Sequence, residues 1–381
     1  MSRETGPGWR RLSALQPDHS LFARCLYLEG YDFSSNIYAL CGDYLTLIDA
    51  GNDYTAFIQL FAEGFKPADV QKVVLTHGHM DHAMGTVELL RAYPSILREG
   101  RLEVVLHREG PEELKEIVRE CGLHLREVEG GETLELSGFT FEVLATPGHT
   151  ADGICLYHAE SATLITGDMV LPYGIVAPDP GAGGNLRDYL SSLRQLLSLK
   201  VENLLPGHWE PVFGHARQVI RDTYEGLIKR AAGKDAPWAE LALEMLRRGH
   251  LEEVVYCCER RLGENPQDTS FLGLKATCLC DLGRFREAAE AFEAVLGGDP
   301  GNFLALVGKG RALMGLGDYE GSLECFERAL EKRPGSLEAL VYKGLALSLA
   351  GRHEEAMAIG PFREEFARRF AENVLEGRGA V

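Results

Sequence analysis

The sequence predicts an α/β domain followed by an all-α repeat domain, and three observations support this order. The chain has 381 residues, more than a single domain usually contains. From residue 20 to about 210, short apolar runs alternate with amphipathic stretches, which is typical of sheets with helices outside them. After about residue 234 the sequence becomes helical and repetitive. We therefore expect one domain over 1–232 and a second over 235–381.

The predicted strands of the first domain are apolar runs that end at Gly, Pro, Asp or His. They occupy 44–51, 72–82, 102–110, 139–150 and 162–168, with a shorter one at 203–205. Helices are predicted between them. One starts near Ala83, and another follows the stripe of Leu and Tyr side chains from Leu186 to Leu197.

Three histidines and one aspartate follow the apolar segment 73–75 within six residues, at His77, His79, Asp81 and His82. The whole chain has 12 histidines, so this local density argues against an ordinary polar turn. Side chains of these types on one loop at a strand end can converge on metal, and they suit zinc, iron or manganese. The sequence therefore predicts a metal site at this strand end.

The motif His-x-His-x-Asp-His resembles the signature of the metallo-β-lactamase superfamily, and four further motifs stand in that family's order. They are Asp49 in Leu-Ile-Asp-Ala-Gly, His149 in Thr-Pro-Gly-His-Thr, Asp168 in Thr-Gly-Asp and His208 in Leu-Pro-Gly-His. The resemblance covers about 20–230. It implies an αββα sandwich and a metal-dependent hydrolase.

The resemblance also implies a role for each motif residue. His77, His79 and His149 would hold one divalent ion, and Asp81, His82 and His208 would hold a second. Asp168 would bridge the two ions, and Asp49 would orient one of the metal-bound histidines. We expect zinc, with iron or manganese as alternatives. Two such ions share a hydroxide that attacks an electrophilic carbon or phosphorus.

The substrate is predicted from charge. The chain carries 39 basic and 57 acidic residues, and no Lys or Arg cluster flanks the metal motifs, where a ribonuclease needs phosphate contacts. We therefore expect hydrolysis of a small ester or thioester, with Asp81 aligning the hydroxide. Tyr173 is expected to be a catalytic residue alongside Asp81 and Asp49, and it and the loop 172–184 are expected to border the pocket. The alternatives are a metal-dependent phosphodiesterase or ribonuclease, and an adaptor in which the hydrolase domain is secondary.

The second domain repeats at a regular interval. Glycines at 249, 283, 317 and 351 are evenly spaced, and prolines at 266, 300 and 334 keep the same spacing. Each glycine is expected where a helix ends and the chain turns, and each proline where the second helix of a pair ends. The pattern resembles the tetratricopeptide repeat over about 236–370. It predicts three full repeats, a degenerate fourth broken by Gly360 and Pro361, and a capping helix over 361–377.

The partners and location follow from the same features. Stacked repeats form a concave groove that would take an apolar or extended peptide, the hydrolase domain or a second subunit of a homo-oligomer. The predicted groove positions are Gly273, Thr277, Val307, Arg311, Val341 and Leu345. The net charge of −18 argues against nucleic acid, no apolar run is long enough to cross a membrane, and the N-terminal residues lack a signal-peptide pattern. We therefore predict a cytoplasmic enzyme acting on a small molecule.

Overall fold

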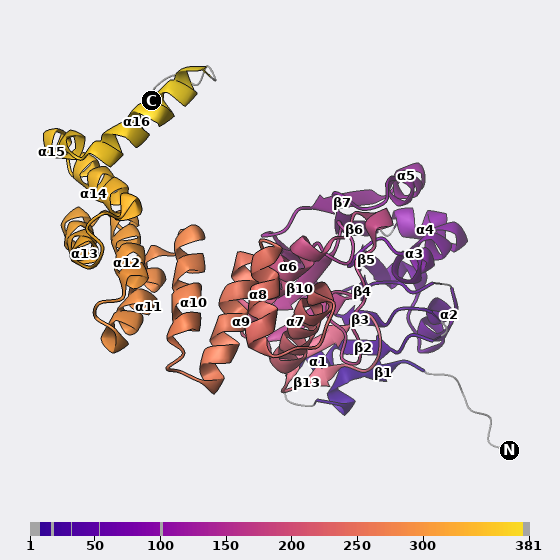
Figure 1. Ribbon diagram of the computed structural model, residues 1–381. Helices are drawn as coiled ribbons and strands as arrows, with labels where there is room; N and C mark the ends of the chain where they lie inside the picture. The colour runs from indigo at the N-terminus through magenta and orange to yellow at the C-terminus, as the bar shows by residue number, and fades with distance from the viewer. Residues whose placement is uncertain (1–7, 17–18, 32, 53, 100–101, 376–381) are drawn as a thin grey trace. The chain divides into compact units, whose positions relative to one another are not determined.

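The computed structural model describes residues 8–16, 19–31, 33–52, 54–99 and 102–375. The chain forms two compact units, Met1–Leu227 and Ile228–Val381, whose elements are labelled in Figure 1. The predicted division at 232–235 lies just after helix α7 (Ala216–Ala232) and stays a prediction. Residues 1–7 and 17–18, part of the N-terminal stretch that lacks a signal-peptide pattern, lie outside the described residues. Residues 376 and 377 of the predicted capping helix also lie outside them.

Two mixed β-sheets form the centre of the first unit. The first sheet has the strand order β1-β2-β3-β4-β5-β6-β7, with β4 to β7 mutually parallel. Its strands are β1 (Arg10–Arg11), β2 (Cys25–Leu28), β3 (Ile37–Cys41), β4 (Leu45–Ile48), β5 (Val70–Val74), β6 (Glu103–His107) and β7 (His124–Val128). The second has the order β13-β12-β11-β10-β9-β8, with β11 and β12 parallel. Its strands are β8 (Thr133–Leu136), β9 (Phe139–Ala145), β10 (Ile154–His158), β11 (Thr163–Gly167), β12 (Asn203–Pro206) and β13 (Val212–Phe213).

The core lies between these sheets, because alternate side chains of their strands face one another. Ile48, Val74 and Val105 of the first sheet pack with Phe141 and Leu156 of the second. The opposite face of the first sheet packs on helices α2 (Thr55–Ala62), α3 (Met80–Ala92), α4 (Pro94–Glu99) and α5 (Glu112–Glu120), which Figure 1 shows along its outer side. Helices α6 (Leu186–Ser198) and α7 cover the second sheet. The predicted αββα sandwich is confirmed.

The structure corrects one predicted boundary that bears on the metal motif. The helix expected near Ala83 begins at Met80, with His79 as its N-terminal capping position. The strand before it ends at Val74, well short of residue 82. Asp81 and His82 therefore lie in the first helical turn and not in the loop, so their side chains project from a rigid element.

Several strands were not predicted. They are β1, β2, β3, β7, β8, β10 and β13. Strand β10 is buried along its whole length, so its sequence shows no alternation of apolar and polar residues that would distinguish a strand. Strand β7 lies at a sheet edge and carries polar side chains.

The second unit is a succession of antiparallel helices, shown in orange and yellow in Figure 1. They are α8 (Trp238–Arg247), α9 (Leu251–Glu264), α10 (Thr269–Asp281), α11 (Phe285–Gly298), α12 (Phe303–Gly315), α13 (Tyr319–Lys332), α14 (Leu337–Leu349), α15 (His353–Ala358) and α16 (Gly360–Leu375). The in-phase glycines at 249, 283, 317 and 351 all have φ between +75° and +82°, which glycine adopts without steric cost. The predicted all-α repeat fold is confirmed.

Contacts inside the second unit recur with the sequence period. Three lysines pair with glutamates of the preceding helix, at Lys275–Glu259 (2.8 Å), Lys309–Glu293 (2.5 Å) and Lys343–Glu327 (2.9 Å). Aromatic packing recurs as well: Phe326 lies against Gly310, and Phe362 lies against Gly344 one period later. The short α15 displaces this last aromatic contact to α16, so the degenerate fourth repeat keeps its packing with a residue of the capping helix.

Among the described residues, no helix has both the length and the apolar character needed to cross a membrane.

Candidate metal centre

The first cluster of ligand-type side chains consists of His77, His79 and His149. His77 and His79 follow strand β5, and His149 follows β9. One ligand atom of each lies within 4.8 Å of the others, and His79 Nδ1 lies 3.1 Å from His149 Nε2. The three rings thus direct nitrogen atoms toward one point from two strand ends.

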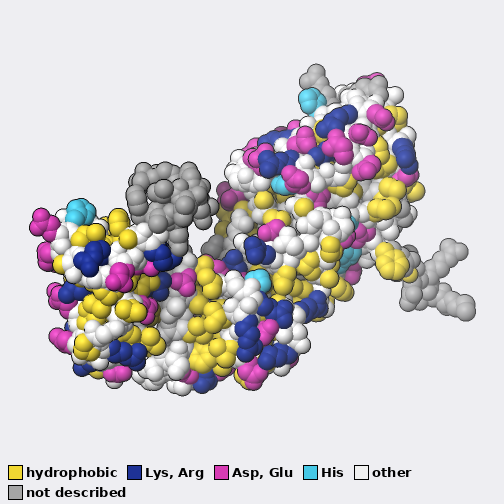
Figure 2. All heavy atoms as spheres, turned by 45° about the horizontal axis from the view of Figure 1, so that its top comes forward, with side chains coloured by type: hydrophobic (Ala, Val, Ile, Leu, Met, Phe, Trp, Pro, Cys, Tyr) yellow, Lys and Arg dark blue, Asp and Glu magenta, His cyan; other side chains and the backbone are white. Residues whose placement is uncertain are grey.

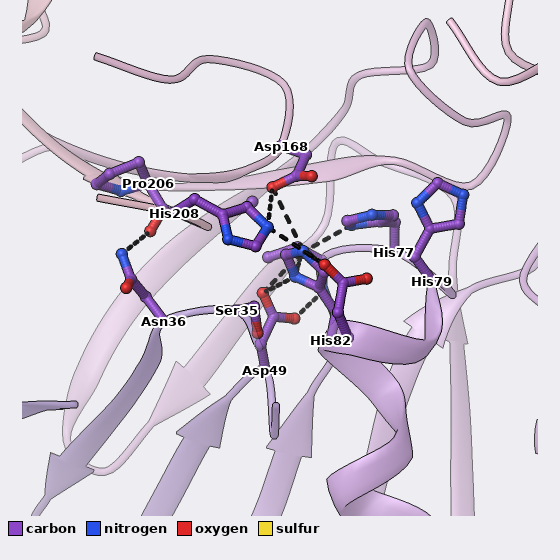
Figure 3. Close-up of polar contacts among 12 residues, drawn as sticks. Ser35, Asn36, Asp49, His77, His79, His82, Asp168, Pro206 and His208 are labelled. Carbon is purple, nitrogen blue, oxygen red and sulfur yellow. Dashed lines mark hydrogen bonds and ion pairs between the residues drawn. The ribbon is translucent and has the colours of Figure 1, made fainter. Parts of the chain in front are cut away.

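The second cluster consists of Asp81, His82, Asp168 and His208 (Figure 3). His208 Nε2 lies 3.2 Å from Asp81 Oδ2, and His82 Nε2 lies 3.7 Å from the same oxygen. The residues come from the first turn of α3 and from the loops that follow β11 and β12. Their convergence depends on neighbouring parallel strands, whose carboxyl ends meet at one edge of each sheet.

Asp168 connects the two clusters. Its Oδ1 lies 3.3 Å from His82 Nε2 and 3.4 Å from His208 Nε2, while its Oδ2 lies 3.9 Å from His149 Nε2. One carboxylate oxygen therefore faces each group of histidines. Gly207 permits this approach, because a Cβ atom there would lie 2.5 Å from Asp168 Oδ1.

The donor set fits metal ions better than it fits a hydrogen-bond network. His77 Nε2, His82 Nε2 and Asp168 Oδ1 are buried and have no hydrogen-bond partner. Buried polar atoms without a partner are rare in folded proteins, and here all three face the clusters. The His/Asp set is therefore compatible with a dinuclear metal site.

Asp49 directs one of these histidines. It follows β4, and its Oδ2 accepts a hydrogen bond from His82 Nδ1 at 2.8 Å. Thr76 donates its backbone N–H to Asp49 Oδ1 and its hydroxyl to Oδ2, both at 2.8 Å. A proton held on His82 Nδ1 leaves the Nε2 lone pair free and directed toward the other side chains of the second cluster. A carboxylate commonly fixes a metal-binding imidazole in this way.

Burial and charge shift the protonation of the site in opposite directions. Burial and the neighbouring His82 hold the pKa of His77 well below its usual range, which favours the neutral, ligating form. Burial opposes the charged form of His208, but the nearby carboxylates of Asp168 and Asp81 prevail and raise its pKa to about 9. Burial also works against ionisation of Asp168, yet the charge of His82 and the nearby His208 keep its pKa well below the usual value.

The loop after β11 contacts the first cluster through groups that the sequence did not single out. Asp179 Oδ2 lies 3.1 Å from His79 Nε2, and the Ala177 carbonyl lies 2.8 Å from His149 Nδ1. The Asp179 N–H donates to the His149 carbonyl at 2.7 Å. The predicted border loop 172–184 thus orients two histidines. A lone aspartate in a Pro-rich stretch carries no motif by which it could have been identified.

A second unpredicted contact set holds the segment around His208. The Asn36 side-chain amide donates to the carbonyls of Pro206 at 2.9 Å and Trp209 at 2.6 Å. The Tyr38 hydroxyl also donates to the Pro206 carbonyl, at 2.8 Å. Strand β3 and the loop before it therefore fix the backbone on both sides of His208, although the two segments lie far apart in the sequence.

Tyr173 lies at the rim and not among the clustered residues. Its side chain is exposed, and its ring is 6.3 Å from that of Trp209, which in turn lies 6.4 Å from His208. Two of the histidines outside the motifs have structural contacts: His158 Nδ1 meets Ser161 Oγ at 2.7 Å, and His215 Nδ1 meets the Phe213 carbonyl at 2.9 Å.

Comparison with known proteins places these features in two families. A model of the metallo-beta-lactamase superfamily matches residues 30–208, and a tetratricopeptide repeat model matches 274–320 and 307–360. The probable metallo-hydrolase MJ0888 of Methanocaldococcus jannaschii is 31% identical over 49% of this chain and 92% of its own length. Thioesterase pkgB of Emericella nidulans is 31% identical over 46% of this chain.

The match to the fungal protein covers 43% of that protein's length, so this chain corresponds to less than half of it. Among solved structures, a metallo-beta-lactamase family protein from Thermus thermophilus, TTHA1429, is 24% identical with a TM-score of 0.43. That match covers 58% of this chain and 86% of the other.

Proposed function

Because the chain belongs to the metallo-beta-lactamase superfamily, we propose that its first unit is a metal-dependent hydrolase that cleaves an ester or thioester. The observation that carries this proposal is the pair of ligand clusters joined by Asp168, with its buried atoms that lack hydrogen-bond partners. A relative named as a thioesterase supports the choice of bond.

Each cluster would hold one divalent ion. His77, His79 and His149 would bind the first, Asp81, His82 and His208 the second, and Asp168 both. Zinc suits imidazole and carboxylate ligands at a site without cysteine, and iron or manganese would be accepted by the same set. When bound, such ions supply a nucleophilic water near neutral pH and polarise a carbonyl oxygen.

The protein's own groups would orient and protect this chemistry. Asp49 keeps the proton of His82 on Nδ1, and Asp168 keeps the two clusters at a fixed separation. Asp81 is less buried than His82, so its carboxylate can accept a hydrogen bond from the attacking water and align it. Water adds to the carbonyl carbon, and the carbon–sulfur or carbon–oxygen bond breaks. One proton of the water leaves with the thiol or alcohol, the other passes to solvent, and the acid leaves as a carboxylate.

Charge favours a carbonyl substrate over a phosphodiester. Within the described residues, the ion pairs of the clustered side chains join histidines to aspartates, and none of these pairs involves a Lys or Arg. Figure 2 shows acidic and basic side chains interspersed over the face in view. A ribonuclease needs cationic side chains that hold the phosphate backbone beside the metals. We therefore propose that the chain does not act on nucleic acid.

The repeats would recruit a protein or peptide partner. A groove of about 360 Å³ lies along α10, α11 and α12, lined in part by Gly273, Thr277 and the exposed Leu304. Two of the predicted groove positions, Gly273 and Thr277, lie in it. An open, partly apolar groove of this kind suits an extended peptide, of another protein or of a second copy of this chain.

The function is tested by metal analysis and a substrate panel. Wild-type protein purified without chelator should contain close to two equivalents of zinc, iron or manganese, and should cleave an acyl thioester such as S-lactoylglutathione. The panel also includes a homoserine lactone, bis-p-nitrophenyl phosphate and a short single-stranded RNA. Cleavage of the phosphodiester or RNA alone would overturn the proposal in favour of a phosphodiesterase. Absence of bound metal would favour the adaptor alternative.

A further inference from the structure

Two aromatic residues near the metal centre adopt a backbone conformation that is unfavourable for bulky side chains. Phe33 has φ of 69° and Trp209 has φ of 64°. The left-handed region is sterically unfavourable for a bulky residue, whereas glycine adopts it freely. Such strain persists only where surrounding contacts impose it, and it is concentrated at binding and catalytic sites. The strained backbone therefore indicates a functional role for these two residues.

The loops that carry these rings are joined to each other and to the metal centre. The Asn36 side chain, from the loop that contains Phe33, donates to the Trp209 carbonyl at 2.6 Å. The Ser35 N–H, from the same loop, donates to the Asp81 carbonyl at 3.0 Å. Trp209 directly follows His208, and their rings lie 6.4 Å apart. Both loops therefore border the second cluster, as Figure 3 shows for Ser35 and Asn36.

The segments that border the second cluster carry exposed apolar side chains. Phe33 is 92% exposed, Tyr173 74%, Met80 68% and Trp209 44%. Met80 stands in the sequence between His79 and Asp81, and the rings of Tyr173 and Trp209 meet edge to face at 89°. Large apolar groups gathered at the edge of a polar site indicate a surface that becomes covered when a ligand binds.

We propose that Trp209 and Tyr173 form an aromatic wall that selects substrates with an aromatic acyl group. This inference rests on the proposed ester or thioester hydrolysis and specifies its substrate class. The aromatic ring of the acyl group packs against Trp209 and Tyr173 in an offset or edge-to-face arrangement, while its carbonyl carbon reaches the metal centre beside His208. The hydrogen bond from the Asn36 amide holds the Trp209 backbone, so the indole keeps its position when substrate is absent.

The experiment compares two thioesters of one thiol, the benzoyl and acetyl thioesters of N-acetylcysteamine, in metal-loaded full-length protein. The measured quantity is the ratio of their kcat/KM values, which removes general effects on the metal centre. We expect Trp209→Ala to lower the benzoyl-to-acetyl ratio roughly tenfold, mainly by raising KM for the benzoyl thioester. Tyr173→Ala should lower it less, and Trp209→Phe should keep most of it.

Matched controls separate this effect from misfolding. Ile58→Ala removes an exposed apolar side chain from α2, away from the metal centre, and should leave the ratio at the wild-type value. All variants should bind as much metal as the wild type. An unchanged ratio in both Trp209→Ala and Tyr173→Ala, with metal retained, would overturn the aromatic wall.

A further measurement distinguishes failure of the proposed hydrolysis from failure of the aromatic wall. If wild-type protein cleaves neither thioester, calorimetric titration with benzoate and acetate still tests the wall. Tighter binding of benzoate that Trp209→Ala removes supports the wall although the reaction is another one. Equal binding of benzoate and acetate overturns the wall whatever the reaction.

Discussion

The two units differ in how far apart in sequence their interacting residues lie. In the first unit, Asp49 contacts His82, His79 contacts Asp179, and Asn36 contacts Trp209. In the second unit, each lysine–glutamate pair joins two neighbouring helices, and the pairs recur with the sequence period. The first unit therefore assembles one site from many distant segments, whereas the second repeats one local arrangement.

This difference determines how each unit should respond to a single substitution. Each residue of the metal centre has a distinct position and no duplicate, so its loss is not compensated. Each pair in the repeats has equivalents one period away, and repeat stability is approximately a sum of local terms. Substitutions should therefore have large, coupled effects in the first unit and small, additive effects in the second.

The largest effect is expected at Asp168, the residue that joins the two clusters. Asp168→Asn removes the charge shared by both metal positions while preserving side-chain size. We expect kcat/KM for the best thioester to fall at least about 10³-fold, with loss of bound metal. Glu293→Gln in the repeats provides the matched control and should leave both quantities unchanged. A metal-replete Asp168→Asn protein with full activity would contradict the role given to this residue.

Smaller effects are expected from the two carboxylates that orient histidines. Asp49 is buried and contacts His82, whereas Asp179 is partly exposed and contacts His79. Asp49→Asn should weaken metal binding about 10- to 100-fold, and Asp179→Asn should weaken it less. Competition with a chromophoric chelator measures both affinities. The reverse order would show that the loop 172–184 matters more to the metals than the buried carboxylate does.

Metal affinity should also depend on pH. In the metal-free protein the pKa of His208 is raised to about 9, so below pH 9 a metal ion must displace its proton. Apparent affinity should therefore increase between about pH 6.5 and 9 and then level off. Chelator competition at several pH values measures this slope. His208→Asn should reduce the slope, because one of the displaced protons is gone.

The smallest effect is expected from the ion pairs of the repeats. Lys309→Met breaks the pair with Glu293, whose side chain is largely exposed, and should lower the free energy of unfolding by no more than about 0.5–1 kcal/mol. The same substitution at Lys275 should add independently to it. Thermal unfolding of the single and double variants tests additivity. A double variant much less stable than the sum would show that the repeats are coupled as tightly as the metal centre.

Local patterns were enough to predict the repeats and the metal motifs. The regular spacing of 249, 283, 317 and 351 identified the turn glycines, because a chain that leaves a helix through a tight turn favours a positive φ. The motif around His77 predicted four side chains that the structure places in the two ligand-type clusters, because residues this close in sequence cannot be far apart in space. The strand-end motifs of Asp49, Asp168 and His208 were identified through the family resemblance.

Tertiary structure alone decided how those residues are supported. Asn36 and Trp209 are 173 residues apart, and Asp179 and His79 are 100 apart, so no local pattern relates them. The start of α3 at Met80 and the left-handed backbone of Trp209, whose carbonyl accepts a hydrogen bond from Asn36, likewise depend on contacts with other segments. A sequence determines which side chains are available, but hydrogen bonds form only between groups that the packing of the sheets brings within about 3 Å.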